Sequence, residues 1–183
     1  MSRDDALALL KKYLKNQNLL KHCLACEAIM KDLAPRFNQS PEEWALVGLL
    51  HDIDYEMTKN SPETHGIEGA RILSEAGYPD NVVAALRSHN PATCYNPNSV
   101  LEKALYAVDP VSGFIVACAL VHPHRTLHEL DLDFLVNRFK EKSFTRGADR
   151  CQIQSCQDLQ LNLNDFLLIA LHSMQKISPQ LGL

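Results

Sequence analysis

The sequence predicts an all-α fold, and three observations indicate it. Apolar residues recur every three or four positions along most of the chain, as they do on the buried face of a helix. Several of these segments begin with a capping residue followed by acidic residues, and they end at Pro or Gly. The alternating pattern of a half-buried strand is not found. We therefore expect one domain over residues 1–183, a helical bundle with its core at about 18–122 and C-terminal helices at 130–177 packed on it.

The first two helices are predicted at residues 2–15 and 18–34. Pro35 ends the second helix, because proline disfavours helical geometry in the residue before it. His22 lies inside this second segment. A single helical histidine is more often a surface or hydrogen-bonded core residue than a metal ligand, so His22 alone carries little weight.

A third helix begins with a strong start signal. Ser40 can cap it, and Pro41 suits the first helical position. The apolar pattern then predicts a helix that runs to His51 and Asp52. Gly48 in its interior costs about 1 kcal/mol relative to alanine. Close approach of another helix would explain that cost.

The same start signal recurs at residues 61–64 and predicts a fourth helix with His65 in its first turns. Gly77 ends this helix. A short helix follows and runs to His89, and Pro91 breaks the pattern just beyond it.

A long apolar helix is predicted over about residues 99–121, with Asp109 and Pro110 inside it. We expect Pro110 to kink or restart the helix and so to help aim the carboxylate of Asp109 inward. The remaining helices are predicted at 130–139, 147–159 and 162–177.

A second group of histidines follows the long helix. His122, His124 and His128 lie in a connector that also contains Pro123. No carboxylate or thiolate shares their pattern, so we expect a solvated loop rather than a metal site.

Composition narrows the range of partners and compartments. With a net charge of −4 and an isoelectric point near 6.0, the protein has no overall positive charge that would attract a nucleic acid polymer or an anionic membrane. The N-terminus lacks the order of a signal peptide, and the longest strongly apolar run, 114–121, is too short to span a bilayer. We therefore expect a cytoplasmic protein with six reduced cysteines. The pair Cys23 and Cys26 falls in a helical pattern, which favours core packing over a zinc site.

Six polar residues stand out on these apolar helices: His22, His51, Asp52, His65, His89 and Asp109. Imidazole with carboxylate suits Fe, Mn, Ni, Co or Zn, so the expected cofactor is one or two divalent transition metal ions. His22, His51, Asp52 and Asp109 can form one mixed site. His65 and His89 would supply a second metal, with Asp52 free to bridge. Two metals about 3.5–4 Å apart can activate a water and neutralise a leaving phosphate oxygen.

The order of these residues resembles the HD-domain superfamily of metal-dependent phosphohydrolases. His22, His51 with Asp52, and Asp109 match its H…HD…D pattern, and the two other histidines match the additional ligands of its dinuclear members. Surrounding segments resemble a group of small uncharacterised HD-domain hydrolases: 48–56 (GLLHDIDYE), 65–69 (HGIEG), 76–79 (AGYP), 87–90 (RSHN), 107–110 (AVDP) and 142–144 (KSF). The match spans about residues 18–175.

The resemblance implies a helical bundle with metals at its centre, and two chemistries. Most characterised members hydrolyse phosphate esters, as nucleotidases, cyclic nucleotide phosphodiesterases and ppGpp hydrolases do. A minority, similar to myo-inositol oxygenase, hold two irons and use O₂. Tyr55 stands where the HD nucleotidases have an acidic residue, which leaves Asp54 and Glu56 as the nearby carboxylates. The cyclic-di-GMP group has paired histidines followed by Gly-x-Gly-Tyr-Pro, whereas here Gly-Tyr-Pro precedes the single His89, so that activity is not implied.

The sequence therefore predicts a metal-dependent phosphohydrolase that attacks a small phosphate ester or nucleotide with a metal-activated water. The predicted catalytic residues are Asp52, Asp54 and Lys142, with Asp54 orienting His51 or the water. Lys142, Arg146 and Arg87 are candidates to hold the phosphate. The alternatives are a di-iron oxygenase and a non-catalytic metal- or nucleotide-binding module. Substrate identity and oligomeric state stay open.

Overall fold

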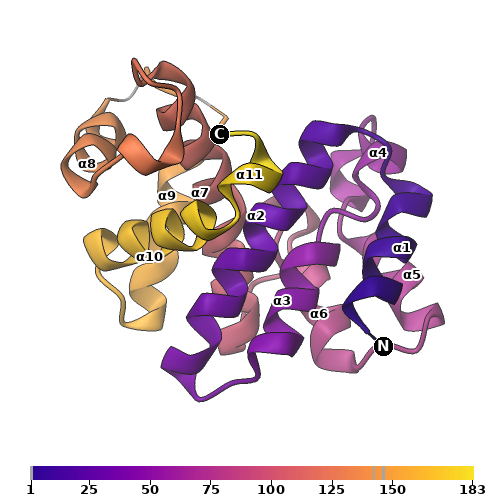
Figure 1. The fold of residues 1–183 in the computed structure, drawn as a ribbon. Coiled ribbons are helices and arrows are strands. Elements are labelled where there is room, and N and C mark those ends of the chain that lie inside the picture. The colour runs from indigo at the N-terminus through magenta and orange to yellow at the C-terminus, as the bar shows by residue number, and fades with distance from the viewer. Residues whose placement is uncertain (1, 142, 146) are drawn as a thin grey trace.

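The computed structural model describes residues 2–141, 143–145 and 147–183, and all regular secondary structure in these ranges is helical (Figure 1). The α-helices are α1 (Arg3–Tyr13), α2 (Gln17–Leu33), α3 (Pro41–Leu50), α4 (Tyr55–Thr58), α5 (Ile67–Glu75), α6 (Asp80–Ser88), α7 (Val100–Val121), α8 (Leu132–Lys140), α9 (Arg150–Gln154), α10 (Leu163–Lys176) and α11 (Ser178–Leu181). Short 3₁₀ segments lie at Ala34–Phe37, Pro62–Thr64, Pro91–Thr93, Leu127–Glu129 and Ser155–Leu159. The predicted all-α class is confirmed.

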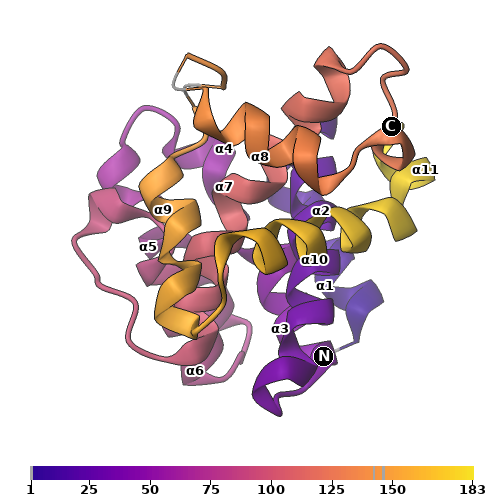
Figure 2. The same ribbon diagram turned by 90° about the vertical axis from the view of Figure 1, so that its left-hand side faces the viewer.

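Helix α2 lies at the centre and packs against α3, α7 and α10 (Figures 1 and 2). Its contact with α3 is unusually close at Gly48. A Cβ added there would lie 2.6 Å from the carbonyl oxygen of Cys26 in α2, a distance that real side chains do not reach. Close helix packing therefore explains the interior glycine, as predicted from the sequence.

Helix α7 forms the second central element, and its buried face includes Val108, Val111 and Phe114. The helix is continuous through Pro110, so the expected restart does not occur. By length and composition α7 is apolar enough to cross a membrane, but 56% of its most apolar window is buried inside the protein. That burial is typical of a core helix.

Two of the predicted helix starts, at Ser40 and Asn162, agree with the structure. The Ser40 hydroxyl accepts a hydrogen bond of 3.3 Å from the Glu43 amide, and Pro41 is the first helical residue. Asn162 caps α10 in the same way through the amide of Asp165, at 2.9 Å. These caps satisfy amides that have no partner within the helix.

Two predicted helices differ from the structure at the histidines they carry. Helix α3 ends at Leu50, so that His51 and Asp52 lie in the turn beyond it. The start signal at 61–64 forms only the 3₁₀ segment Pro62–Thr64, and α5 begins at Ile67. His65 lies in the break, where its backbone is extended (φ −65°, ψ 130°).

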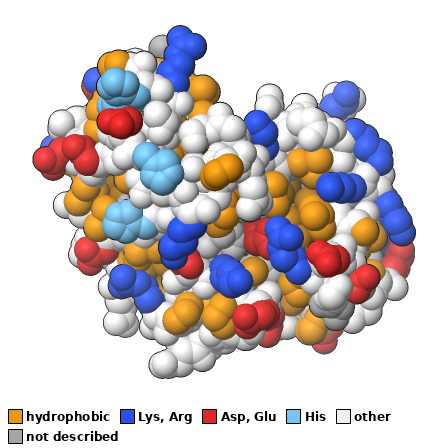
Figure 3. Space-filling view, viewed as in Figure 1, with side chains coloured by type: hydrophobic (Ala, Val, Ile, Leu, Met, Phe, Trp, Pro, Cys, Tyr) orange, Lys and Arg blue, Asp and Glu red, His pale blue; other side chains and the backbone are white. Residues whose placement is uncertain are grey.

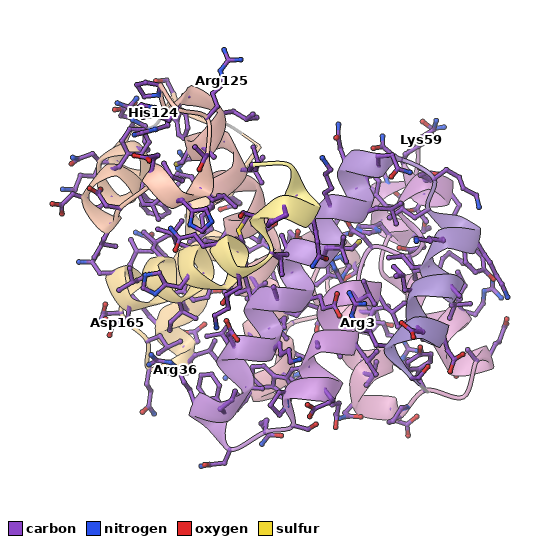
Figure 4. The ribbon with its side chains drawn as sticks, viewed as in Figure 1. Arg3, Arg36, Lys59, His124, Arg125 and Asp165 are labelled. Carbon is purple, nitrogen blue, oxygen red and sulfur yellow. The ribbon has the colours of Figure 1, made fainter. Side chains whose placement is uncertain are left out.

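The C-terminal helices pack on the centre through α10, which contacts α2 and α7. The predicted helix at 147–159 is instead α9 followed by the 3₁₀ segment Ser155–Leu159. The second group of histidines lies at the surface, as predicted: His124 and His128 are exposed. Figure 4 shows His124 and Arg125 pointing outward, and Figure 3 shows imidazoles on the surface of this part of the molecule. All six cysteines are free thiols.

Candidate metal centre

The six predicted ligands come from five separate parts of the chain and meet between α2, α3 and α7. His22 lies within α2 and Asp109 within α7. The other four lie at helix ends or in breaks between helices: His51 and Asp52 after α3, His65 before α5 and His89 directly after α6. Helix ends therefore deliver most of the site.

One cluster is formed around His22 and His51, whose Nε2 atoms lie 3.0 Å apart. Asp109 Oδ1 lies 3.2 Å from Nε2 of His22 and 3.8 Å from Nε2 of His51. Asp52 reaches the same two nitrogens, with Oδ2 at 3.4 Å from His22 and Oδ1 at 3.4 Å from His51. Two imidazoles and two carboxylates thus converge on one point.

A second cluster adjoins the first through Asp52. The Nε2 atoms of His65 and His89 are 3.0 Å apart. Asp52 Oδ1 lies 3.1 Å from His65 Nε2 and 3.7 Å from His89 Nε2. Asp52 therefore contacts all four imidazoles, which is the bridging arrangement expected from the sequence. The role of these six residues as metal ligands remains a prediction.

The outward-facing nitrogens of His51 and His89 are both held by main-chain carbonyl groups. Nδ1 of His51 lies 2.8 Å from the oxygen of Gly48, and Nδ1 of His89 lies 2.6 Å from the oxygen of Leu86. A carbonyl oxygen only accepts, so Nδ1 must carry the proton in both rings. Each carbonyl lies three residues before its histidine, at a helix end where carbonyl groups lack helical partners.

The other two imidazoles are held by side chains. Nδ1 of His65 donates to Asp54 Oδ1 at 2.9 Å. Nδ1 of His22 lies 2.8 Å from Ser112 Oγ, which donates its own hydrogen to the carbonyl of Asp109 at 3.1 Å. The serine oxygen therefore accepts from His22, and this ring also carries its proton on Nδ1.

This network tests whether the site suits a cation. With Nδ1 protonated in all four rings, each neutral imidazole directs an unprotonated Nε2 toward the centre. In each cluster two Nε2 atoms lie 3.0 Å apart, and their lone pairs repel each other unless a proton or a metal ion lies between them. Imidazole nitrogens with this kind of partner on Nδ1 are the usual ligands of Zn, Fe, Ni and related ions. The donor set therefore fits one metal at each Nε2 pair.

The charges also favour a cation. Burial lowers the pKa of His65, but hydrogen bonds to Asp52 and Asp54 outweigh it and raise the pKa to about 10. Burial likewise lowers the pKa of His51, yet the negative charge of Asp52, the thiol of Cys26 and a hydrogen bond to Asp109 together outweigh it and raise the pKa to about 9. Burial raises the pKa of Asp109, but hydrogen bonds from His22 and His51 bring it well below its usual range. The two carboxylates thus stabilise positive charge at this point.

Asp54 has a different partner from the one the sequence suggested. It contacts His65 rather than His51, and it is fully buried. Its Oδ2 also accepts hydrogen bonds from the amides of Gly66 at 2.8 Å and Gly69 at 2.7 Å. These bonds replace helical partners at the start of α5, which explains why the predicted fourth helix breaks at His65.

The two glycines of the HGIEG segment were not recognised from the sequence as parts of the site. A Cβ at Gly69 would lie 3.2 Å from Cγ of Asp54. Gly66 has φ +87°, and a Cβ there would lie 2.4 Å from the oxygen of Leu86 and 3.2 Å from the ring of His89. The sequence feature that could have identified these glycines is their position one and four residues after His65.

The residues next to Asp54 do not provide a free carboxylate. Glu56 faces away from the centre, and its Oε1 accepts from the amides of Lys15 at 3.1 Å and Asn16 at 2.6 Å. Tyr55 packs edge-on against His65, with ring centroids 5.3 Å apart, and lines the pocket above the metal centre.

This pocket has a volume of about 350 Å³, and we call it the mouth pocket. Its lining consists of Leu19, His22, Asp52, Tyr55, His65, His89, Asn90, Pro91, Asp109 and Gly147. No Lys or Arg is found among these lining residues, which all belong to the described part of the chain. Arg87 is exposed on α6 and does not line the pocket. Lys142 and Arg146, the other predicted phosphate-binding residues, lie outside the described residues.

Cys26 lies at the edge of the first cluster, although the sequence suggested an ordinary core residue. Its Sγ is 3.9 Å from both ring nitrogens of His22, so the thiol lies against that ring. The ligand atoms of Cys26, His22 and His51 all lie within 4.8 Å of one another.

Comparisons with known proteins identify the family of the part of the chain that carries this cluster. The family model for the HD domain matches residues 19–112, which include all six clustered residues. Ribonuclease Y of Mycoplasma genitalium is 30% identical over 79 residues, covering 43% of this chain and 16% of the relative. Ribonuclease Y of Geobacter sulfurreducens is 26% identical over 98 residues, covering 54% of this chain and 18% of the relative. An uncharacterised protein of Methanocaldococcus jannaschii is 33% identical over 94 residues, covering 49% of this chain and 54% of the relative.

The matched region is therefore less than a fifth of the length of ribonuclease Y and about half that of the archaeal relative. No solved structure matched the chain. The family match covers just over half of the sequence and coincides with the elements that carry the clustered histidines and aspartates. This chain belongs to the HD domain family.

Proposed function

We propose that this protein is a metal-dependent phosphohydrolase that hydrolyses a small phosphate ester. The observation that carries the proposal is the position of Asp52. Its carboxylate lies between two Nε2 pairs and within 3.1 to 3.7 Å of a nitrogen in each of the four imidazoles. A shared carboxylate of this kind suits two cations held close together.

The residues divide into those that hold the metal and those that hold the ligands. His22, His51 and Asp109 would bind one ion, His65 and His89 the other, and Asp52 both. Bound divalent metal ions would supply an activated water nucleophile and neutralise charge on the leaving oxygen. Asp54 then acts as a positioning residue, because its two oxygens already accept from His65, Gly66 and Gly69.

The mouth pocket supports a small substrate. Its volume of about 350 Å³ is at the lower end of the range for small-molecule sites. A phosphate group brings negative charge, which bound metal ions would balance. The side of the pocket at His22, His65 and Asp109 is partly open to solvent, which gives the phosphate a path of entry.

The relatives support phosphate chemistry without naming a substrate. Ribonuclease Y acts, by its name, on RNA, whose nucleotides are joined by phosphate diesters. Because this chain matches less than a fifth of that enzyme, and its net charge is −4, we propose a small phosphate ester rather than an RNA polymer. RNA belongs in the test as a competing substrate.

The proposal is tested by loading metal-free protein with Mn²⁺, Co²⁺, Ni²⁺ or Fe²⁺ and measuring phosphate release from a broad panel of phosphate monoesters, diesters and RNA. We expect turnover of small esters that is lost in H89A and on chelation. Absence of hydrolysis with every metal would contradict the proposal. In that case O₂ consumption with two bound irons would favour the oxygenase, and lower thermal stability on chelation without turnover would favour a non-catalytic module.

A further inference from the structure

The mouth pocket continues into a longer groove between α2 and α7. A second hollow of about 310 Å³ shares His22, Asp109 and Gly147 with the mouth pocket. A third hollow of about 450 Å³ shares His22 and Gly113 with the second one. The three are therefore contiguous, and we call the second and third together the side groove.

One face of α7 forms a wall of this groove. Asp109, Gly113, Val116 and Leu120 follow the spacing of residues on a single helix face, and all of them line the connected hollows. The wall therefore begins at a metal-binding carboxylate and becomes apolar along the helix. Leu120, one residue before the end of α7, is 54% exposed.

The opposite wall is formed by the first turns of α2 and by α11, which lie side by side (Figure 1). Leu181 contributes an apolar surface, and Asn18 and Lys21 are exposed at the edge. Ser112 also lines this hollow, but its hydroxyl is already bonded to His22 and the carbonyl of Asp109. The far end of the groove is therefore lined by apolar side chains on both walls, with the polar side chains of Asn18 and Lys21 beside them.

Gly113 borders open space in the groove. It lies in the middle of the wall and is exposed, and a Cβ placed on it would meet no atom within 4 Å. A glycine inside a helix costs about 1 kcal/mol relative to alanine. Neither a positive φ nor a close contact requires glycine here. A large side chain at this position would therefore extend into the groove.

We propose that the side groove binds the non-phosphate part of the substrate, and that this part is an extended, largely apolar chain. The inference rests on the proposed phosphohydrolase activity and specifies its substrate class: a phosphate monoester of an elongated apolar alcohol. The phosphate would lie at the metal centre, and the chain would pass Gly113 and end against Val116, Leu120 and Leu181.

The groove fits such a chain better than a nucleoside. Ribose hydroxyls and base edges leave water at a cost unless protein groups replace their hydrogen bonds. At the far end of the side groove Val116, Leu120 and Leu181 provide none, and Asn18 and Lys21 are exposed. An alkyl chain needs none, and its burial contributes about 0.8 kcal/mol for each CH₂ group.

Binding and turnover of a homologous series test the proposal. Metal-loaded protein is titrated calorimetrically with ethylphosphonate and octylphosphonate, which cannot be hydrolysed as esters, and kcat/KM is measured for ethyl phosphate, octyl phosphate and AMP. We expect octylphosphonate to bind at least tenfold more tightly than ethylphosphonate, and octyl phosphate to be preferred over ethyl phosphate and AMP.

Two variants with a matched control locate the effect. Leu120 and Val121 are equally exposed, at 54% each, but only Leu120 lines the groove. L120D should reduce the octyl-to-ethyl binding ratio at least fivefold, and V121D should leave it unchanged. G113F should reduce the same ratio by filling the groove, whereas G113A should retain most of it. Circular dichroism checks that each variant is folded.

The outcomes separate this inference from the proposed function. Equal binding of the two phosphonates, or equal losses in L120D and V121D, would overturn the side groove as a substrate site even if short esters are hydrolysed. A change in sedimentation of L120D without a change in binding would also overturn it and would indicate that a second copy covers this surface. Tight octylphosphonate binding without hydrolysis of any ester would instead retain the groove and overturn the proposed function.

Discussion

Nδ1 of His65 donates a hydrogen bond of 2.9 Å to the carboxylate of Asp54, a residue with no exposed surface. The same carboxylate accepts from the amides of Gly66 and Gly69. One buried side chain therefore determines the tautomer of His65, its position and the start of α5. The part of the candidate metal centre formed by His65 and His89 therefore depends on a residue that does not line the mouth pocket.

Replacing Asp54 with asparagine should weaken the second metal position selectively. The asparagine oxygen can replace only part of the carboxylate, and its NH₂ group would face N–H donors. Loss of such a partner typically lowers metal affinity about 10–100-fold. We expect D54N to bind one ion with wild-type affinity and the second much more weakly, as measured by calorimetric titration of metal-free protein.

Glu56 provides the control for D54N. It lies two residues further along the chain, and its carboxylate also accepts from two amides, but these belong to the connection between α1 and α2. E56Q should retain both metal affinities. Equal binding of two ions by D54N and by wild type would refute the positioning role of Asp54.

Gly66 should tolerate no side chain. Its φ of +87° costs an L-residue about 1–2 kcal/mol, and a Cβ would also lie 2.4 Å from the carbonyl oxygen of Leu86. Gly77 has a similar φ of +80° but no atom within 4 Å of such a Cβ. We expect G77A to reduce the free energy of unfolding in urea by about 1–2 kcal/mol and G66A by about 3 kcal/mol or more.

G66A should also lower metal affinity, because the added methyl group would lie against the ring of His89. G77A should leave metal affinity unchanged. Similar losses of stability in the two variants would show that the left-handed backbone, and not the contact with α6, determines the requirement for glycine.

The pH dependence of the metal-free protein should be opposite to that of metal binding. The folded-state pKa values of His51, about 9, and His65, about 10, lie above the ordinary value of 6.5. Protonation therefore stabilises the metal-free fold fully below about pH 6.5, and this contribution is lost as the pH rises toward 9–10. In EDTA we expect Tm to fall between pH 7 and 9.5.

Metal ions displace these protons, so affinity should increase with pH over the same range. Titrations at pH 7 in two buffers with different ionisation enthalpies should detect net proton release on metal binding. Proton uptake, or a Tm in EDTA that rises with pH, would contradict this description of the electrostatics.

The sequence was sufficient to predict the helical class and the six clustered residues. Each of the six is a polar residue next to an apolar helical pattern, and together they follow the residue order of the HD family. They could therefore be grouped as one site without knowledge of their separation in space. Capping signals also located helix starts well, as Ser40 and Asn162 show. Helical periodicity and capping signals are determined by residues close together in the chain, so the sequence alone shows them.

The sequence was less informative where one stretch determines the conformation of another. The start signal at 61–64 is as strong as the one at Ser40, yet the helix does not form there, because Asp54 binds the amides of Gly66 and Gly69 from twelve and fifteen residues away. The partner of Asp54 was misassigned for the same reason: helical spacing favoured His51, and a non-helical turn brought it to His65. Ser112 escaped notice because its contact with His22 spans 90 residues.

The central claim is that Asp52 is shared by two metal ions, and metal stoichiometry in three proteins tests it most directly. Metal-free wild type, H89A and D52A are titrated with Mn²⁺ by calorimetry, and helix content is checked by circular dichroism. The account predicts two ions per chain in wild type, one in H89A and none in D52A, with helix content preserved. Metal binding by D52A at the wild-type stoichiometry would contradict it.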